Sequence, residues 1–199
     1  MTHKEVTTPE GGTRWRRFAA VMIPATLAVG AVGVGIATGT VPVTFAVSGA
    51  QFVVTATHLH GDGFVQYGSI VQEKNGTPHA VAVSEITSAD LTNLCQSVAQ
   101  STPIGTVVLK LTAGDAGVKA HADGLLIDMT QLSGDATFDT IKIGVDASLL
   151  SPLGAPGGFG QSATSIDVDN VRQVAWATTA GTFTLPHLNL TLGGAGSGC

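Results

Sequence analysis

Two histidines and an aspartate stand at alternate positions in the stretch His58-Leu59-His60-Gly61-Asp62. Alternate residues of a β-strand point to the same face, so a strand here would bring the two imidazoles and the carboxylate together. Zinc accepts both kinds of ligand, and His58, His60 and Asp62 therefore form a candidate metal site. The alternative interpretation is a solvent-facing strand end followed by a Gly-Asp-Gly turn. We favour this alternative, and we assign no metal and no cofactor.

The same stretch resembles the opening of the metallo-β-lactamase motif H-x-H-x-D-H, except that Gly63 stands in place of the final histidine. Four further carboxylates, Asp135, Asp139, Asp167 and Asp169, could in principle serve calcium. Their spacing does not follow the D-x-[DN]-x-[DN]-G calcium loop. We interpret them as residues of turns and of solvated strand faces.

No serine of the chain stands in the G-x-S-x-G context of an α/β-hydrolase nucleophile. Ser197 comes nearest, but its surroundings miss the pattern and it lies in a Gly-rich tail. The sequence therefore supplies no catalytic residue, and our prediction leans toward a protein that is not an enzyme.

The chain contains two cysteines, Cys95 and the final residue, Cys199. Outside the cell an isolated pair of cysteines most often forms a disulfide, and we predict that bond here. The alternatives are a free, buried Cys95 and an intermolecular bridge through Cys199.

Composition narrows the class of protein. Of 199 residues, 26 are glycine, 44% are hydrophobic and only 12% are charged, with a mean hydropathy of +0.34. Disorder requires low hydrophobicity and high charge, so it is excluded. A formal charge of −5 with nine basic residues argues against a nucleic-acid partner. What remains is a β-rich protein that is exported or linked to a membrane.

The charges are unevenly distributed. Arg14, Arg16 and Arg17 belong to a basic tail, residues 1–17, and no charged residue occurs from Phe18 to Gly61. The apolar stretch Phe18 to Ala37 would span about 30 Å as a helix, which matches a bilayer. We predict a signal-anchor over residues 18–39, with the basic tail in the cytoplasm by the positive-inside rule. The alternative is a cleaved signal peptide and a secreted protein.

Residues 40–199 predict one extracytoplasmic β-rich domain, a β-sandwich or a wound β-sheet. Short runs with β alternation end at Gly, Asp, Asn or Ser, as in residues 43–49, 51–59, 79–86, 106–114 and 182–192. Residues 122–147 predict two strands joined at Ser133-Gly134-Asp135, and residues 151–162 predict a loop. Only residues 88–100 allow a short helix, which Ser88 could cap.

Several phrases resemble one family over nearly the whole chain: the segment from Gly11 to Ala37, QFVVTATHLHGDGFVQYG, LTNLCQSV, and VRQVAWATTAGTFTLPHLNLTL with a terminal cysteine. It is an uncharacterised family of actinobacterial, streptomycete-type, membrane-anchored or exported proteins. Its members often carry labels such as "cholesterol esterase" or "twin-arginine signal domain protein". The resemblance implies a membrane segment, one exterior β-rich domain and a small multi-pass membrane partner, but no established activity.

The function expected from these observations is that of a non-enzymatic, membrane-tethered cell-envelope protein acting by protein or lipid contacts. One alternative is a module that binds or transfers lipid in an apolar groove. Another is a secreted, esterase-type hydrolase. The sequence does not indicate an oligomeric state.

Overall fold

A computed structural model describes residues 48–199 of the chain. The predicted basic tail with Arg14, Arg16 and Arg17, and the predicted anchor over residues 18–39, lie outside the described residues. Between residues 48 and 199 no helix has the length and apolar character needed to cross a membrane.

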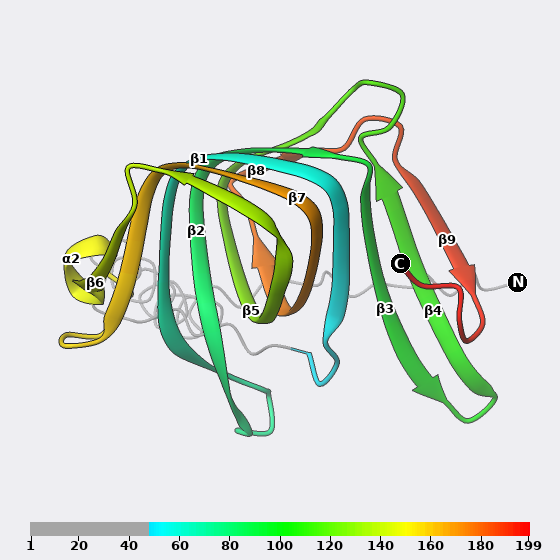
Figure 1. The fold of residues 1–199 in the computed structure, drawn as a ribbon. Helices are drawn as coiled ribbons and strands as arrows, with labels where there is room; N and C mark the ends of the chain where they lie inside the picture. Colours follow the sequence, from blue (N-terminus) through cyan, green and yellow to red (C-terminus); the bar gives the residue numbers. More distant parts are fainter. Residues whose placement is uncertain (1–47) are drawn as a thin grey trace, which may run out of the picture. The chain divides into compact units, whose positions relative to one another are not determined.

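The described chain is almost entirely β-structure, which confirms the prediction of a mainly β protein (Figure 1). Its elements are β1 (Phe52–Gln72), β2 (Pro78–Thr92), β3 (Leu94–Thr102), β4 (Gly105–Ala113), β5 (Ala120–Asp139), β6 (Lys142–Asp146), α2 (Ala147–Leu150), β7 (Phe159–Thr179), β8 (Thr182–Thr184) and β9 (Asn189–Gly193).

All nine strands belong to one antiparallel sheet with the order β6-β7-β5-β2-β1-β3-β4-β9, and β8 pairs with β5. An additional pairing joins β7 to β1 along most of both strands, from Phe52↔Ala175 to Tyr67↔Gly160. Strands β1, β2, β5 and β7 therefore form a closed ring, in which every member pairs with two others. Closure satisfies the backbone groups that an open sheet leaves at its edges.

The main core lies inside this ring, and many of its residues are small. Five of its alanines are at most 5% exposed: Ala56, Ala89, Ala120, Ala122 and Ala175. Four strands enclose a narrow interior, so small side chains must alternate with larger ones such as Phe64 to fill it.

Gly61 shows how tight this interior is. A Cβ atom on Gly61 would lie 2.8 Å from Ile86 Cγ2 and 3.2 Å from Ile166 Cγ2. The glycine of the His-x-His-Gly-Asp stretch thus lets two neighbouring strands pack closely, and it does not mark the end of a strand.

Strands β3, β4 and β9 extend the sheet beyond the ring. Cys95 on β3 forms a disulfide with Cys199, which confirms the predicted bond. The bond holds the C-terminal tail against β3, where the backbone N–H of Cys199 donates to Ser97 Oγ at 3.0 Å. Ser97 and Val108, which lie next to Gly198 of the tail, are only 7% and 4% exposed.

Some local predictions were wrong. Residues 88–100 are not a helix but lie in β2 and β3, because Ala89, Leu91 and Leu94 point into the core. Residues Ser133 to Asp135 are not a turn but an irregularity within the continuous strand β5, which runs to Asp139.

Two other boundaries differ from the sequence-based interpretation. The loop expected over 151–162 ends at Gly158, because Phe159 begins β7. The segment 182–192 holds two short strands, β8 and β9, and its leucines are exposed: Leu188 by 52%, Leu190 by 57% and Leu192 by 72%.

Candidate functional site

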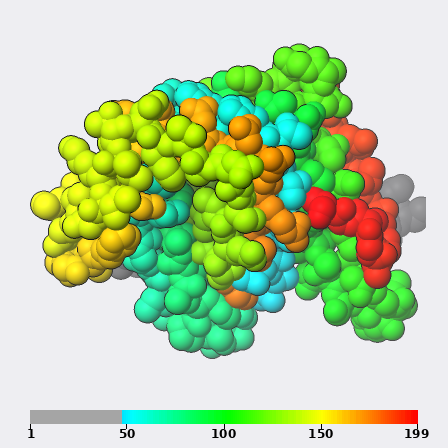
Figure 2. All heavy atoms as spheres, in the orientation of Figure 1, coloured from blue at the N-terminus to red at the C-terminus, as the bar shows by residue number. Residues whose placement is uncertain are grey.

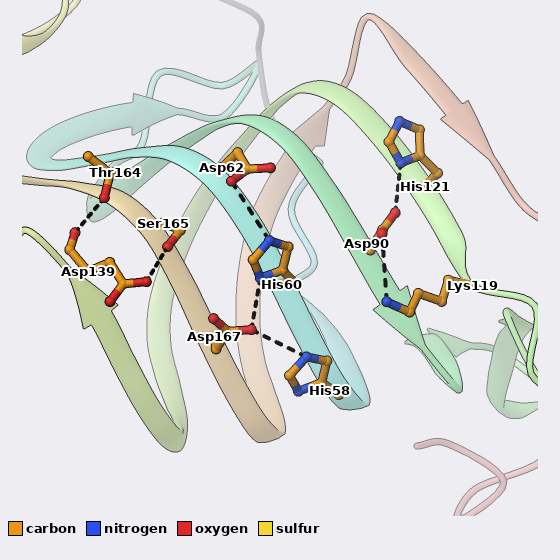
Figure 3. Close-up of polar contacts among 10 residues, drawn as sticks. All are labelled: His58, His60, Asp62, Asp90, Lys119, His121, Asp139, Thr164, Ser165 and Asp167. Atoms are coloured by element: carbon orange, nitrogen blue, oxygen red, sulfur yellow. Dashed lines mark hydrogen bonds and ion pairs between the residues drawn. The ribbon is translucent and has the colours of Figure 1, made fainter.

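A row of alternating histidines and aspartates crosses the four strands of the ring on its outer face (Figure 3). The register places Asp167 of β7 opposite His60 of β1, His60 opposite Asp90 of β2, and Asp90 opposite His121 of β5. His60 Nδ1 lies 2.8 Å from Asp167 Oδ1, and His121 Nδ1 lies 2.8 Å from Asp90 Oδ1. Lys119 adds a contact of 3.8 Å to Asp90. These cross-strand pairs join strands that are distant in sequence.

These contacts shift the pKa values of His60, His121 and Asp90. The hydrogen bond to Asp167 raises the pKa of His60, and the hydrogen bond to Asp90 raises the pKa of His121. In turn, the hydrogen bond from His121 lowers the pKa of Asp90. The contact with Asp167 therefore favours the charged form of His60, and the pair of His121 with Asp90 favours the charged form of both partners.

The predicted metal ligands His58, His60 and Asp62 do lie on one face, as their spacing requires. However, His58 Nδ1 lies 2.8 Å from Asp169 Oδ1, and the ring of His60 contacts Asp167 and, at 3.7 Å, Asp62. Within residues 48–199, no three or more His, Cys, Asp or Glu side chains form a group that could hold a metal ion.

Every histidine in the described part of the chain pairs with a carboxylate. The remaining two histidines pair as His79 with Glu73 and His187 with Asp115, at 2.8 and 2.7 Å. A serine-hydrolase triad needs a histidine ring between a serine hydroxyl and an acid. In the described residues every histidine hydrogen bond goes to a carboxylate, and none goes to a serine.

A second polar cluster is mostly buried. The Tyr67 hydroxyl donates to Glu85 Oε1, and the Ser151 hydroxyl donates to the same oxygen at 2.7 Å. Tyr67 is 2% and Ser151 3% exposed. Burial, together with the hydrogen bond to Glu85, raises the pKa of Tyr67 well above its ordinary value. The cluster connects the loop after α2 to strands β1 and β2.

This cluster borders an open cleft of about 470 Å³. Its apolar lining comes from Val65 of β1, Leu126 of β5, Leu150 at the end of α2, and Pro152 and Leu153 of the following loop. Ile86 and Leu125 also border the cleft, but their side chains belong to the buried core of the ring. Glu85, Thr87 and Ser151 add polar groups to the lining. Among residues 48–199, Glu85 is the only charged residue that lines the cleft.

The segment from β6 to the start of β7 exposes four large apolar side chains, which we call the apolar tip. They are Ile143 (65% exposed), Leu149 (79%), Leu153 (65%) and Phe159 (62%). This segment lies at one end of the described domain (Figure 2), and the apolar tip shares Leu153 with the cleft. Exposed apolar groups that gather in one region commonly mark contact sites for proteins or membranes.

A second cleft, of about 440 Å³, lies near the other end of β7 and is lined by Phe52, Gln96, Trp176 and Thr178, among others. Trp176 Nε1 and Thr178 Oγ1 are buried and lack a hydrogen-bond partner within the described part of the chain. The indole of Trp176 stacks on the ring of His79, with their centroids 3.9 Å apart.

Comparison with known proteins identifies the family. A family described as a family of unknown function, DUF6230, matches residues 48–199. The chain belongs to this family. No curated protein and no solved structure matches the chain.

Two groups of residues in the DUF6230 domain could not be located from the sequence. The sequence brought together His58, His60 and Asp62, but the pairing partners Asp167 and Asp169 lie more than 100 residues away. The Tyr67–Glu85–Ser151 cluster also joins distant segments. Its one sequence signal was the Gly- and Pro-rich loop that begins at Ser151.

Proposed function

We propose that this chain is a membrane-tethered cell-envelope protein. The anchor is the apolar segment 18–39, the N-terminus lies inside, and the DUF6230 domain lies outside. There the domain acts through contacts with lipid or protein and not by catalysis. The disulfide between Cys95 and Cys199 supports an oxidising location for the domain.

The observation that carries the contact function is the apolar tip. Leu149 is 79% exposed although each buried leucine side chain stabilises a protein by about 1.5–3 kcal/mol. Four such side chains within one short segment are costly to leave in water unless they are covered in use. We expect lipid, or a small multi-pass membrane protein, to cover them.

The tether is tested by extracting membranes with alkaline carbonate. The full-length chain should stay in the membrane pellet, and a variant lacking residues 18–37 should appear in the supernatant. Release of the full-length chain by carbonate would show that it is secreted or only peripherally bound.

The contact is tested by photo-crosslinking in cells with benzoylphenylalanine in place of Leu149. A matched control places the same group at Asp115, an exposed residue of the turn after β4. We expect adducts with lipid or with a small membrane protein from position 149 and none from position 115. Equal adducts from both positions, or none from position 149, would contradict the proposal.

A second candidate function is lipid binding or transfer, which the 470 Å³ cleft favours. A cleft of this size lies within the range of small-molecule sites. Native mass spectrometry of the full-length chain should then show a bound lipid after detergent removal. A spectrum of the unliganded mass alone would contradict this candidate.

The actinobacterial origin implied by the resemblance belongs to the proposal, and it makes an actinobacterial host the suitable setting for these experiments. The esterase label remains the third candidate. Hydrolysis of a p-nitrophenyl ester that a single substitution abolishes would favour it over a contact function.

A further inference from the structure

We infer that the cleft beneath the 150–153 loop binds an aliphatic molecule that carries a neutral hydroxyl group, and that it discriminates against the matching carboxylate. The inference rests on the lipid-binding candidate above and names the ligand chemistry of that cleft.

The walls of the cleft determine the body of the ligand. Val65 of β1 and Leu126 of β5 line the cleft together with Leu150 at the end of α2 and Pro152 and Leu153 of the following loop. No aromatic residue of the described part of the chain lines the cleft, so these side chains offer aliphatic contact without a ring to stack on a flat ligand. Burial of aliphatic carbon is favoured at about 25 cal/mol per Å² of apolar surface.

Glu85 determines the polar group of the ligand. Its Oε1 already accepts hydrogen bonds from Tyr67 and Ser151, whereas neither of these bonds involves Oε2. A carboxylate accepts about four hydrogen bonds in all, so Glu85 has capacity for one more donor. A ligand hydroxyl supplies that donor.

A ligand carboxylate does not fit the same position. It would place a second negative charge beside Glu85 in a cleft to whose lining residues 48–199 contribute no basic side chain. Like charges at short range disfavour each other, and burying a charge without a partner adds a further cost. The cleft should therefore distinguish two ligands that have the same chain and differ only in the terminal group.

The mouth of the cleft gives such a ligand a path of entry. Leu153 lines the cleft and is also 65% exposed as part of the apolar tip. A molecule held at the apolar tip can thus pass its chain along Leu153 into the cleft. The hydroxyl end then lies at the Glu85 cluster.

The experiment uses two photoactivatable twelve-carbon probes with a diazirine in the chain, one ending in a hydroxyl and the other in a carboxylate. Full-length chain in lipid nanodiscs is labelled with each probe at neutral pH, and labelled peptides are mapped by mass spectrometry. We expect the alcohol to label residues 125–126 and 150–153 at least about tenfold more than the carboxylate, as for a hydrogen bond to a charged group.

Two variants and a control keep the result interpretable. In Glu85→Gln, the extents of labelling by the two probes should differ by no more than about threefold, because the repulsion between Glu85 and the probe carboxylate is removed. Leu153→Ser, at a largely exposed position, should lower labelling by both probes. Asp115→Asn removes an exposed carboxylate that does not line the cleft and should leave the ratio unchanged. Circular dichroism and an intact disulfide verify the fold of each variant.

Equal labelling of the wild type by the two probes, or a ratio that Glu85→Gln does not change, would overturn the inference. Absence of labelling from both peptides, those with residues 125–126 and 150–153, would overturn it as well. Leu149 does not itself line the cleft, so persistence of the crosslinks from position 149 in that case would leave the contact function intact. Loss of the position 149 crosslinks with the probe preference retained would overturn the contact function alone.

Discussion

Removing the Cys95–Cys199 disulfide should strongly destabilise the DUF6230 domain. The two cysteines are 104 residues apart, so the bond constrains two-thirds of the described chain in the unfolded state. In the chain-entropy treatment, a loop of this length stabilises the folded state by about 4.8 kcal/mol at 25 °C. That is a large part of the roughly 5–15 kcal/mol that separates a typical domain from its unfolded state.

The perturbation is the double variant Cys95→Ala/Cys199→Ala, compared with the oxidised wild type. Urea unfolding of the full-length chain in mild detergent, followed by far-UV circular dichroism, gives the free energy of unfolding and its denaturant dependence. We expect a loss of about 3–5 kcal/mol and a steeper denaturant dependence, because the unfolded chain becomes less compact.

A matched control separates the cross-link from the tail contacts. Ser197→Ala removes the hydroxyl that donates to Gly194 O at 2.7 Å but keeps the disulfide, and it should cost less than about 1 kcal/mol. A loss below about 1 kcal/mol in the double cysteine variant would refute the reasoning. It would mean that the unfolded chain gains little freedom when the bond is removed.

Three further predictions follow from the ring. Gly61→Ala should destabilise by about 1–3 kcal/mol because its Cβ would meet Ile86, whereas Gly68→Ala, with open space around it, should be close to neutral, as urea unfolding can measure. Phe64→Ala should cost about 3–5 kcal/mol because Phe64 is 2% exposed in the core. The contribution of His60 to stability should be present below its ordinary pKa of 6.5 and be lost as the pH rises through its raised folded-state pKa. The melting temperature of the wild type should therefore fall relative to His60→Gln between about pH 5.5 and about pH 9.

Each of these predictions has a contrary outcome. Equal stability of Gly61→Ala and Gly68→Ala would show that the strands of the ring are not closely packed at Gly61. If Phe64→Ala lowered the free energy of unfolding by less than about 1 kcal/mol, the interior of the ring would not be the main core. Parallel pH profiles for wild type and His60→Gln would mean that the pair with Asp167 does not persist in solution.

The sequence predicted the β class and the disulfide because both depend on local signals. Alternating apolar residues indicate strands, and a pair of cysteines in a chain predicted to be exported indicates a disulfide. The sequence did not predict the closed ring, because closure depends on the pairing of β1 with β7. Pairs such as Phe52↔Ala175 join residues more than 100 positions apart.

The wrong local predictions share a physical reason. Ser133-Gly134-Asp135 has the composition of a turn, yet β5 continues through it because β7 pairs with both flanks, from Leu132↔Gln173 to Asp135↔Asp169. Tertiary pairing overrode local preference here, as it did for the helix expected over residues 88–100.

The candidate site was predictable only in part. The spacing of His58 and His60 correctly implied one face of a strand. It could not reveal that aspartates of β7 pair with both rings, or that Glu85 borders an apolar cleft. These relations arise from strand register and from a loop, residues 150–153, that folds back over the sheet.

The most direct test of the central claim is crosslinking in cells from position 149 of the apolar tip, compared with position 115. Contact-based function in the envelope predicts adducts with lipid or with a small membrane protein from position 149 only. Absence of adducts from position 149, in cells where the full-length chain is present and its disulfide is formed, would contradict the account.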